Sequence, residues 1–523
     1  MTEGGGALAA RLAEHEQSSV KDPEVLVIGA GTAGCVVARR LAEQGGKRVM
    51  VIEAGPPFPG WPLRVPLASL RLRPWWSWRL ESIPQPQLDG RRIPFPMGRV
   101  VGGTSSVNAM VAAAGPPADY DAWAAAGNGG WSWADLRPGW ERAISAARTT
   151  ALPIRRPVHE SAFSTAFIRA CEEDGLRRID ALTGVEAETC GMFPLFQGPA
   201  GRSSAARYLT HVPRGVQLSL RPRTTVRRLI MDGTRAVGIE IGGRRGEGRI
   251  LASEAVVLCA GTLQSPHILQ KSGIGPAKAL TAAGIEVAID LPGVGLNLQD
   301  HAGVPVVVES TLPPPGRPAM WLKAAIEYGL FGTGVMASNC CEAGCFLGQA
   351  GMTPDVEVFS HFQTYRVPRS VEFSVVLMHP SSRGTIMPDP DDPWGPPRID
   401  PRILESGKDR SALHAGVERL RSIIAQPALQ RFGLGAEILP GRLSADAFLR
   451  GHASAYYHPV GTCRMGNDPL AVVNPRLRVH GTENVWVVDN SIVPTIPAGH
   501  TAATALLIGE RAADLLTADL GRS

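Results

Sequence analysis

The stretch Val25–Gly34, with the sequence VLVIGAGTAG, constrains the fold of this chain more than any other. Its four leading apolar residues predict a strand that is buried on both faces. Three glycines follow in G-x-G-x-x-G spacing: Gly29, Gly31 and Gly34. The first permits a tight turn, the second lets the backbone approach a pyrophosphate, and the third lets the following helix pack closely on the strand. The N-terminus of that helix offers free N–H groups to phosphates, so we expect a dinucleotide-binding unit.

The segment after this helix supports the same interpretation. A second apolar strand, Val49–Ile52, ends in Glu53, which lies 53 − 34 = 19 residues beyond Gly34. This is close to the ~20 residues expected for an acid that binds a ribose hydroxyl. A carboxylate at this position would repel a 2′-phosphate. We therefore expect an adenine dinucleotide; the alternative is a structural β-α-β unit with a surface acid.

Composition excludes several classes of protein. The chain has 523 residues, 44% hydrophobic and 19% charged, which is typical of a soluble enzyme with two domains or one interleaved pair. The net charge is only +5 and the arginines are scattered, so we expect no nucleic-acid partner. No apolar stretch reaches the ~18 residues of a membrane span. Residues 1–22 show no export signal, so we expect a loose tail and a cytoplasmic location.

The eight cysteines do not indicate a metal site. No two pairs stand at the spacing of a zinc site, and we expect reduced, buried thiols. The cluster Cys340-Cys341 with Cys345 has a metal-binding interpretation, but small buried residues explain it better.

Two loops follow the first β-α-β unit. The proline- and tryptophan-rich passage Pro56–Pro96 is either a lid over a planar ligand or aromatic packing under a surface loop. The passage Met97–Met110 contains a second glycine pair followed by three hydroxyl residues and Asn108, which suits a second backbone loop against a cofactor.

The remaining elements indicate an interleaved chain. We expect a hairpin at Arg221–Ile241, a buried strand at Glu254–Ala260, and a strand at Val485–Val488 that ends at Asp489. The last helix is expected from about His500 to about Leu516. Between 302 and 453 the composition shifts towards prolines and strand-like segments, among them 356–359 and 373–378, which predicts a second domain built mostly from a sheet.

Five stretches together resemble the glucose–methanol–choline (GMC) family of FAD oxidoreductases. They read GRVVGGTSSVN, GTLQSPHILQKSGIG, LPGVGLNLQDH, YHPVGTCRMG and VVDNSIVPTIPAGHT, and they occur in the order of the family. The resemblance is weakest at 302–453. It implies an α/β fold, α+β overall, in which a Rossmann-like FAD-binding domain is interleaved with a mostly antiparallel-sheet substrate domain. We expect the FAD-binding domain at 23–150, 202–301 and 455–523, and the substrate domain at 151–201 and 302–454.

The resemblance also implies a set of FAD-binding residues. The ADP half would lie on the first glycine turn, the adenine near Val226, the flavin against the second glycine loop, and the ribityl chain and ring near the C-terminal segments. The expected residues are Gly29, Gly31, Thr32, Ala33, Gly34, Glu53, Ala54, Val101, Gly103, Thr104, Asn108, Val226, Asp489, His500 and Thr501. Some members of the family hold FAD covalently through a histidine in the second loop, which is absent here. We therefore expect non-covalent FAD and no metal.

The resemblance implies that His458 and His500 are the catalytic residues. Oxidation of an alcohol needs the hydroxyl proton to leave while a hydride passes to flavin N5, and the imidazole pKa of about 6.5 suits that proton transfer. We assign His458 as the general base and His500 as the group that orients the substrate oxygen; as a coupled pair they can exchange roles. His301, His452 and His480 are expected to be structural or surface residues.

The expected function is oxidation of a primary or secondary alcohol to a carbonyl. No second dinucleotide fingerprint is present, so dioxygen, a quinone or a protein carrier would reoxidise the flavin. Tyr456 lies two residues before His458, where it would block dioxygen or line the substrate pocket, and we favour a dehydrogenase over an oxidase. The alternatives are a cyanohydrin-type lyase on the same fold and a flavin-binding protein without turnover.

Overall fold

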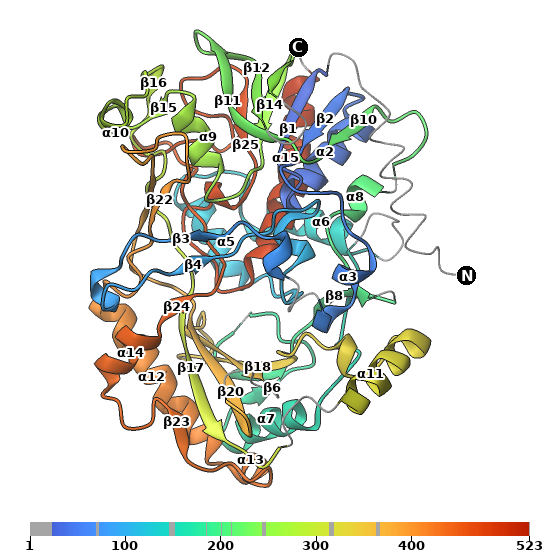
Figure 1. Ribbon diagram of the computed structural model, residues 1–523, viewed down its shortest axis with the longest axis vertical. Helices are drawn as coiled ribbons and strands as arrows, with labels where there is room; N and C mark the ends of the chain where they lie inside the picture. The colour runs from blue at the N-terminus through green and yellow to red at the C-terminus, as the bar shows by residue number, and fades with distance from the viewer. Residues whose placement is uncertain are drawn as a thin grey trace.

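A five-stranded parallel sheet and a larger sheet lie at opposite ends of the protein (Figure 1). The structure is a computed structural model that describes residues 23–521 apart from 69–72, 146–151, 185, 200, 211, 243–246, 313–317 and 362–366. The predicted tail, residues 1–22, lies outside the described residues. The predicted limits of the two domains stay a prediction.

The parallel sheet has the strand order β10-β2-β1-β14-β25. Its strands are short, almost wholly apolar and buried, as expected for a sheet covered on both faces. The strands predicted at Val25–Ile28, Val49–Ile52, Glu254–Ala260 and Val485–Val488 are present as β1 (Val25–Ile28), β2 (Val49–Ile52), β14 (Ala255–Leu258) and β25 (Val485–Val487). The fifth strand is β10 (Leu218–Arg221). The sheet is therefore assembled from segments spread over the whole chain.

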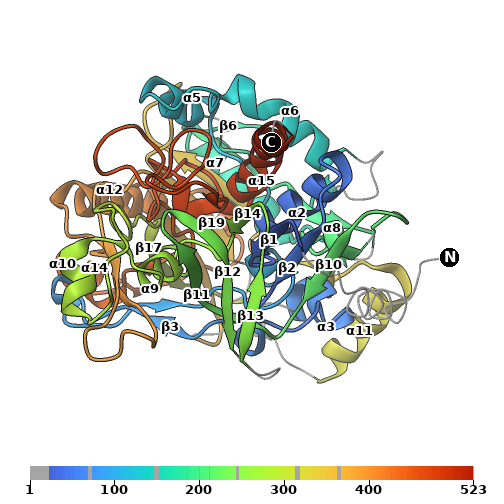
Figure 2. The ribbon, with the colours of Figure 1, turned by 90° about the horizontal axis from the view of Figure 1, so that it is seen from above.

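Two helices from opposite ends of the sequence pack together against this sheet. Helix α2 (Thr32–Gln44) connects β1 to β2, and α15 (Thr501–Leu520) lies beside it (Figure 2). A Cβ on Gly509 of α15 would come within 2.9 Å of the Cβ of Val36, so a glycine permits the close approach. The buried carboxylate of Glu510 accepts a hydrogen bond from Arg40 at 2.9 Å. The last helix is thus one turn longer than the sequence predicts.

The larger sheet has eight strands in the order β23-β17-β20-β19-β18-β7-β6, with β24 paired to β17. All its pairs are antiparallel except β6 with β7, which confirms the mostly antiparallel sheet. Helices α7 (Ala162–Glu173) and α12 (Gly407–Ile424) pack on it. The strands are β6 (Arg177–Arg178), β7 (Thr189–Met192), β17 (Ala302–Glu309), β18 (Ala343–Leu347), β19 (Val356–His361), β20 (Ser370–Leu377), β23 (Glu437–Leu439) and β24 (Ser454–Ala455).

The predicted hairpin around Asp232-Gly233 is present as β11 (Thr225–Asp232) and β12 (Arg235–Gly242), with β13 (Gly248–Leu251) added. The passage 56–96 contains only short elements: α3 (Trp61–Arg64), η1 (Arg73–Trp76), β3 (Leu80–Glu81), η2 (Pro86–Leu88) and β4 (Pro94–Phe95). Trp78 reaches the cavity described below, whereas Trp61 and Trp75 are 70% and 78% exposed. One part of this passage therefore faces the ligand site and another part faces solvent.

The other elements connect the two sheets or cover their edges. They are η3 (Gly103–Ser106), α5 (Pro117–Ala125), α6 (Trp133–Ile144), β5 (Ile154–Arg155), β8 (Leu195–Gly198), β9 (Gly201–Arg202), α8 (Arg207–Thr210), α9 (Ser265–Lys271), β15 (Ile274–Gly275), α10 (Ala277–Ala282), β16 (Ile289–Asp290), α11 (Pro318–Phe331), η4 (Val335–Ala337), β21 (Thr385–Met387), β22 (Arg398–Asp400), α13 (Pro427–Gln430), α14 (Ala445–His452) and η5 (Asn490–Ile492).

The structure also bears on the cysteines and on membrane crossing. All eight cysteines are buried free thiols, and the described residues contain no group of side chains that could hold a metal ion. None of the helices in the described part of the chain combines the length and the hydropathy that a membrane crossing requires.

Candidate active site

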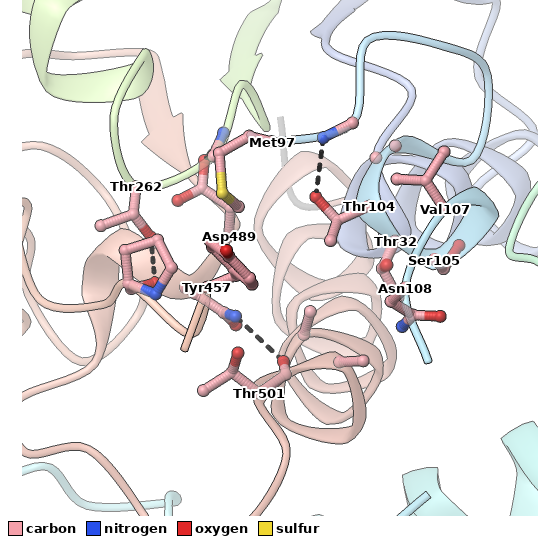
Figure 3. Close-up of a pocket in the computed structure, with 18 of the residues that line it drawn as sticks. Thr32, Met97, Thr104, Ser105, Val107, Asn108, Thr262, Tyr457, Asp489 and Thr501 are labelled. Atoms are coloured by element: carbon pink, nitrogen blue, oxygen red, sulfur yellow. Dashed lines mark hydrogen bonds between the residues drawn. The ribbon is translucent and has the colours of Figure 1, made fainter. Parts of the chain in front are cut away.

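A cavity opens at the carboxyl ends of the parallel strands and continues to the larger sheet. Crevices outside the carboxyl ends of parallel strands are where open α/β sheets bind their ligands. Figure 3 shows Thr32, Thr104, Ser105 and Asn108 on one side of the cavity and Thr262, Asp489 and Tyr457 on the other. The cavity is therefore enclosed by segments that are far apart in the sequence.

The first glycine turn forms a backbone cradle in this cavity. Gly29 has a φ of 106°, and a Cβ there would clash with the carbonyl oxygen of Cys259. A Cβ on Gly34 would clash with the carbonyl oxygen of Gly29, so Gly34 serves the packing of helix on strand. A Cβ on Gly103 would lie 2.7 Å from the Cα of Gly31, so the two glycine loops touch. This bare backbone at the start of α2 fits a pyrophosphate.

Glu53 marks the far end of the cradle. Its side chain follows β2, where Oε2 accepts a hydrogen bond from the N–H of Ala30 at 2.9 Å and Oε1 accepts one from Gly55 at 2.7 Å. Burial raises the pKa of Glu53, and the two N–H groups partly offset this effect. The carboxylate lines the cavity together with Ala54 and Val226. These residues fit the adenosine end of a dinucleotide.

The second glycine loop is held from behind by Arg202, which the sequence analysis missed. This buried guanidinium donates hydrogen bonds to Oδ1 of Asn108 at 2.8 Å and to its backbone oxygen at 2.6 Å. The N–H of Met110 also donates to Oδ1 of Asn108, at 3.0 Å. Burial lowers the pKa of Arg202 to about 9. Because Oδ1 is occupied on two sides, the amide nitrogen of Asn108 is the group left to donate into the cavity.

Asp489 connects the C-terminal segment to the start of α9. Its carboxylate accepts hydrogen bonds from Oγ of Ser265 at 2.5 Å and from the N–H groups of Gly261 and Ser491 at 2.9 and 2.8 Å. Burial raises the pKa of Asp489. The residue lines the cavity with Thr501, the first residue of α15.

The two expected catalytic histidines meet in this cavity. The ring centroids of His458 and His500 are 4.9 Å apart, at an interplanar angle of 77°. The backbone N–H of His458 donates to Oδ1 of Asp300 at 2.9 Å, and that of His500 donates to the carbonyl of Ala113 at 2.7 Å. Hydrogen bonds from their backbone N–H groups to segments distant in the sequence therefore position both histidines.

A third histidine, His301, contacts this pair, although we expected it to be structural. Its Nδ1 lies 2.9 Å from Nδ1 of His458. Burial, with the charges of His500 and His379, lowers the pKa of His301 to about 3. Burial and the two neighbouring histidines also hold the pKa of His458 well below its ordinary value. Both rings are therefore neutral at neutral pH.

Glu357 is a further residue that the sequence analysis missed. Its Oε1 lies 3.2 Å from Nε2 of His500, and the residue is fully buried. Glu357 stands on β19, where side chains alternate between the two faces of the sheet. Phe359 and His361 follow Glu357 at intervals of two residues, so they lie on the same face of β19, and both line the cavity. Two polar residues, Glu357 and His361, on the same face of a largely buried strand are the signal that would have indicated this face.

Most of the expected cofactor residues line the cavity. These are Gly29, Gly31, Thr32, Ala33, Glu53, Ala54, Gly103, Thr104, Asn108, Val226, Asp489, His500 and Thr501. Gly34 and Val101 do not line it. Gly34 packs against the turn, and Val101 is fully buried, with its N–H donating to the carbonyl of Pro56 at 3.0 Å. These two residues support the glycine loops from behind.

The fold and this site define a dinucleotide-dependent oxidoreductase. The chain belongs to the GMC oxidoreductases, whose N-terminal and C-terminal sequence profiles match residues 23–303 and 380–509. The cofactor is therefore FAD, and the enzyme acts on CH–OH groups, as the motifs predicted.

Relatives and solved structures agree with this family over the whole length. The chain is 34% identical to the oxygen-dependent choline dehydrogenase of Pseudomonas syringae pv. tomato, over 94% of this chain and 93% of that protein. It is also 34% identical to the mitochondrial choline dehydrogenase of Homo sapiens, over 98% and 92%. The crystal structure of pyridoxine 4-oxidase from Mesorbium loti superposes with a TM-score of 0.83 at 31% identity, covering 94% of this chain and 99% of that one.

Proposed function

We propose that this enzyme oxidises an uncharged primary or secondary alcohol to a carbonyl, with His458 as the general base. One observation carries the proposal: His458 faces the cavity beside His500, and within the described part of the chain its Nε2 has no hydrogen-bond partner. A neutral imidazole with a free nitrogen is the group that proton removal requires.

FAD, when bound, supplies the hydride acceptor for the alcohol carbon. Nε2 of His458 receives the hydroxyl proton, and the low pKa of the buried ring keeps that nitrogen unprotonated before the alcohol arrives. His500, whose ring centroid lies 4.9 Å from that of His458 and whose ring is hydrogen-bonded to Glu357, orients the hydroxyl group. The amide of Asn108, held by Arg202, donates a hydrogen bond towards the cofactor.

The charge of the cavity supports a neutral substrate. The carboxylates on its wall are Glu53 and Asp489, and both are hydrogen-bonded to backbone N–H groups of the cofactor cradle. Around the histidines the wall is formed by Phe359, His361 and Tyr456. A cationic alcohol such as choline would find aromatic rings there, whereas Glu357 is hydrogen-bonded to His500 and is not among the described residues that line the cavity. We therefore favour an uncharged or aromatic alcohol over choline.

The electron acceptor is dioxygen, a quinone or a protein carrier, and we favour a dehydrogenase over an oxidase. Tyr456 motivates this choice because its side chain stands on the cavity wall close to His458. The cytoplasmic location stays a prediction.

Anaerobic mixing of the purified enzyme with an alcohol panel tests the function. We expect benzyl alcohol to bleach the flavin faster than choline or glucose. His458→Ala should slow bleaching by roughly 10²–10⁴-fold, the usual worth of a positioned acid–base group. His500→Asn should cost less, because an amide can still form a hydrogen bond with the hydroxyl group. His414→Ala, at an exposed position on α12, is the control.

Three outcomes would contradict parts of this proposal. A flavin that stays oxidised while a cyanohydrin is split would indicate the lyase. A flavin that no alcohol reduces would indicate a protein without turnover. A wild-type rate in His458→Ala would remove the general base, and faster reduction by choline would remove the preference for an uncharged alcohol.

A further inference from the structure

His301 lies behind His458 as seen from the cavity. The residue is fully buried. His458 lines the cavity, whereas His301 is not among the described residues that line it. Nδ1 of His301 lies 2.9 Å from Nδ1 of His458, and this is the hydrogen bond of the His458 side chain within the described residues. His301 therefore touches the expected base but not the substrate.

Hydrogen bonds of the backbone fix the position of His301 relative to His458. Strand β24 pairs with the start of β17, and the N–H of Tyr456 donates to the carbonyl of His301 at 2.8 Å. Asp300, next in the chain to His301, accepts the N–H of His458 through its carboxylate at 2.9 Å. These two hydrogen bonds, each donated by a backbone N–H group, fix the backbone next to both rings and so restrict their movement.

A hydrogen bond between two neutral imidazoles needs one N–H and one lone pair. Nε2 of His301 is buried and has no hydrogen-bond partner among the described residues, while the backbone carbonyls of Pro497 and Met378 near the ring favour a proton on the ring. Carbonyl oxygens accept hydrogen bonds and cannot donate them. We therefore assign the one proton of neutral His301 to Nε2, which leaves Nδ1 of His301 as an acceptor.

We propose that His301 is a positioning residue for the oxidation: its Nδ1 accepts the Nδ1–H of His458 and so keeps the Nε2 lone pair of His458 directed at the substrate hydroxyl. The proton that a histidine carries on one nitrogen is set by the hydrogen bond of the other. Without His301, the proton of His458 is free to move to Nε2, where the ring would donate to the hydroxyl oxygen and could not take its proton.

The groups around His301 are compatible with a neutral ring. His458, His500 and His379 are the titratable rings whose charge acts on this region, and each positive charge there disfavours a second one. The carboxyl group of Asp300 is buried, and burial raises its pKa well above the ordinary value. The pair therefore works by fixing the position of one proton and needs no net charge.

This inference rests on the proposed role of His458, and the experiment separates the two. His301→Leu removes the acceptor, whereas His301→Asn keeps an oxygen that can accept the Nδ1–H of His458. We expect His301→Leu to slow anaerobic flavin reduction by about 10²-fold, with little change in the apparent Kd for the alcohol, and His301→Asn to restore most of the rate. The matched control is His267→Leu, since His267 is equally buried and bonds to the carbonyl of Gly395 at 2.9 Å, away from the cavity wall.

A wild-type rate in His301→Leu, together with a slow His458→Ala, would overturn the inference and leave the proposed function intact. A wild-type rate in His458→Ala would overturn both. If His301→Leu does not retain FAD, nitrogen-15 NMR of the histidine-labelled wild-type holoenzyme still decides. We expect Nε2 of His458, identified by its loss in His458→Ala, to show the chemical shift of an unprotonated nitrogen, and a protonated Nε2 would overturn the inference.

Discussion

The carboxylate of Glu357 has one hydrogen-bond partner among the described residues, Nε2 of His500, at 3.2 Å from its Oε1. Glu357 is fully buried in a sheet whose other inward-facing residues are mostly apolar. A buried carboxylate is costly unless it is paired. Because its one hydrogen bond among the described residues is to His500, we expect its role to be to hold that ring in place.

Replacing Glu357 should therefore affect the reaction through His500. We expect Glu357→Leu to slow flavin reduction by about tenfold, less than loss of the base itself. Glu357→Gln should cost less, because its amide oxygen still accepts the Nε2–H. The measurement is anaerobic stopped-flow reduction at matched FAD content. Equal rates in the wild type and Glu357→Leu would show that His500 needs no such partner.

The flavin should be released from the denatured protein. Residues 103–108 of the second glycine loop include Val107 on the cavity wall and contain no histidine that could bond to the flavin. Acid precipitation of the yellow protein should leave free FAD in the supernatant, identified by its mass. Flavin that stays with the pellet would contradict non-covalent binding.

Tyr456 should control the reaction of the reduced enzyme with dioxygen. Its ring packs closely over Gly303, where an added Cβ would come within 2.6 Å of Cε2. A large side chain can close an access path in a packed interior. We expect Tyr456→Val to raise the rate of reoxidation in aerated buffer and to change anaerobic reduction less. Fast reoxidation of the wild type, unaltered in the variant, would indicate an oxidase and a lining role for Tyr456.

The loop before His500 should make a pH-dependent contribution to stability. Asp119 accepts hydrogen bonds from the N–H of Ala498 at 2.6 Å and from Nε2 of His379 at 3.2 Å. Burial disfavours a charged ring, but the hydrogen bond and charge of Asp119 outweigh it, so the pKa of His379 is raised above its ordinary value of 6.5. A raised pKa stabilises the fold below the unfolded value, and this stability is lost as the pH rises through the folded value.

The thermal unfolding midpoint measures this effect. We expect the wild type to exceed His379→Gln clearly at about pH 5.5, and the difference to shrink towards about pH 9. His414→Gln, with a side chain 48% exposed on α12, is the control for the loss of a surface histidine. A difference that is constant over this range would exclude the ion pair.

Local sequence patterns predicted the parts of the fold that depend on local chemistry. The strands of the parallel sheet are short apolar runs, and the turn after β1 needs glycine at Gly29 because of its positive φ. Such requirements appear in the residues themselves. The pairing of His458 with His500 was also predicted, because each lies in a motif of the family.

The residues that the sequence did not indicate act through contacts between distant segments. His301 and His458 are 157 positions apart and meet because β24 pairs with β17. Arg202 reaches Asn108 from the short strand β9, and Glu357 on β19 reaches His500 at the start of α15. No local pattern encodes which buried arginine, histidine or glutamate will find such a partner.

Strand β25 and helix α15 belong to the last part of the chain, yet they pack on β14 and α2 from its first half. They bring Asp489, His500 and Thr501 to the cavity. A ribosome delivers the chain from its N-terminus, so the glycine turn emerges long before the opposite wall of the cavity exists. We therefore expect stable binding of FAD only after the segment from Val485 onwards has been synthesised, because a nascent chain halted before Val485 would carry the complete glycine fingerprint without this wall of the cavity.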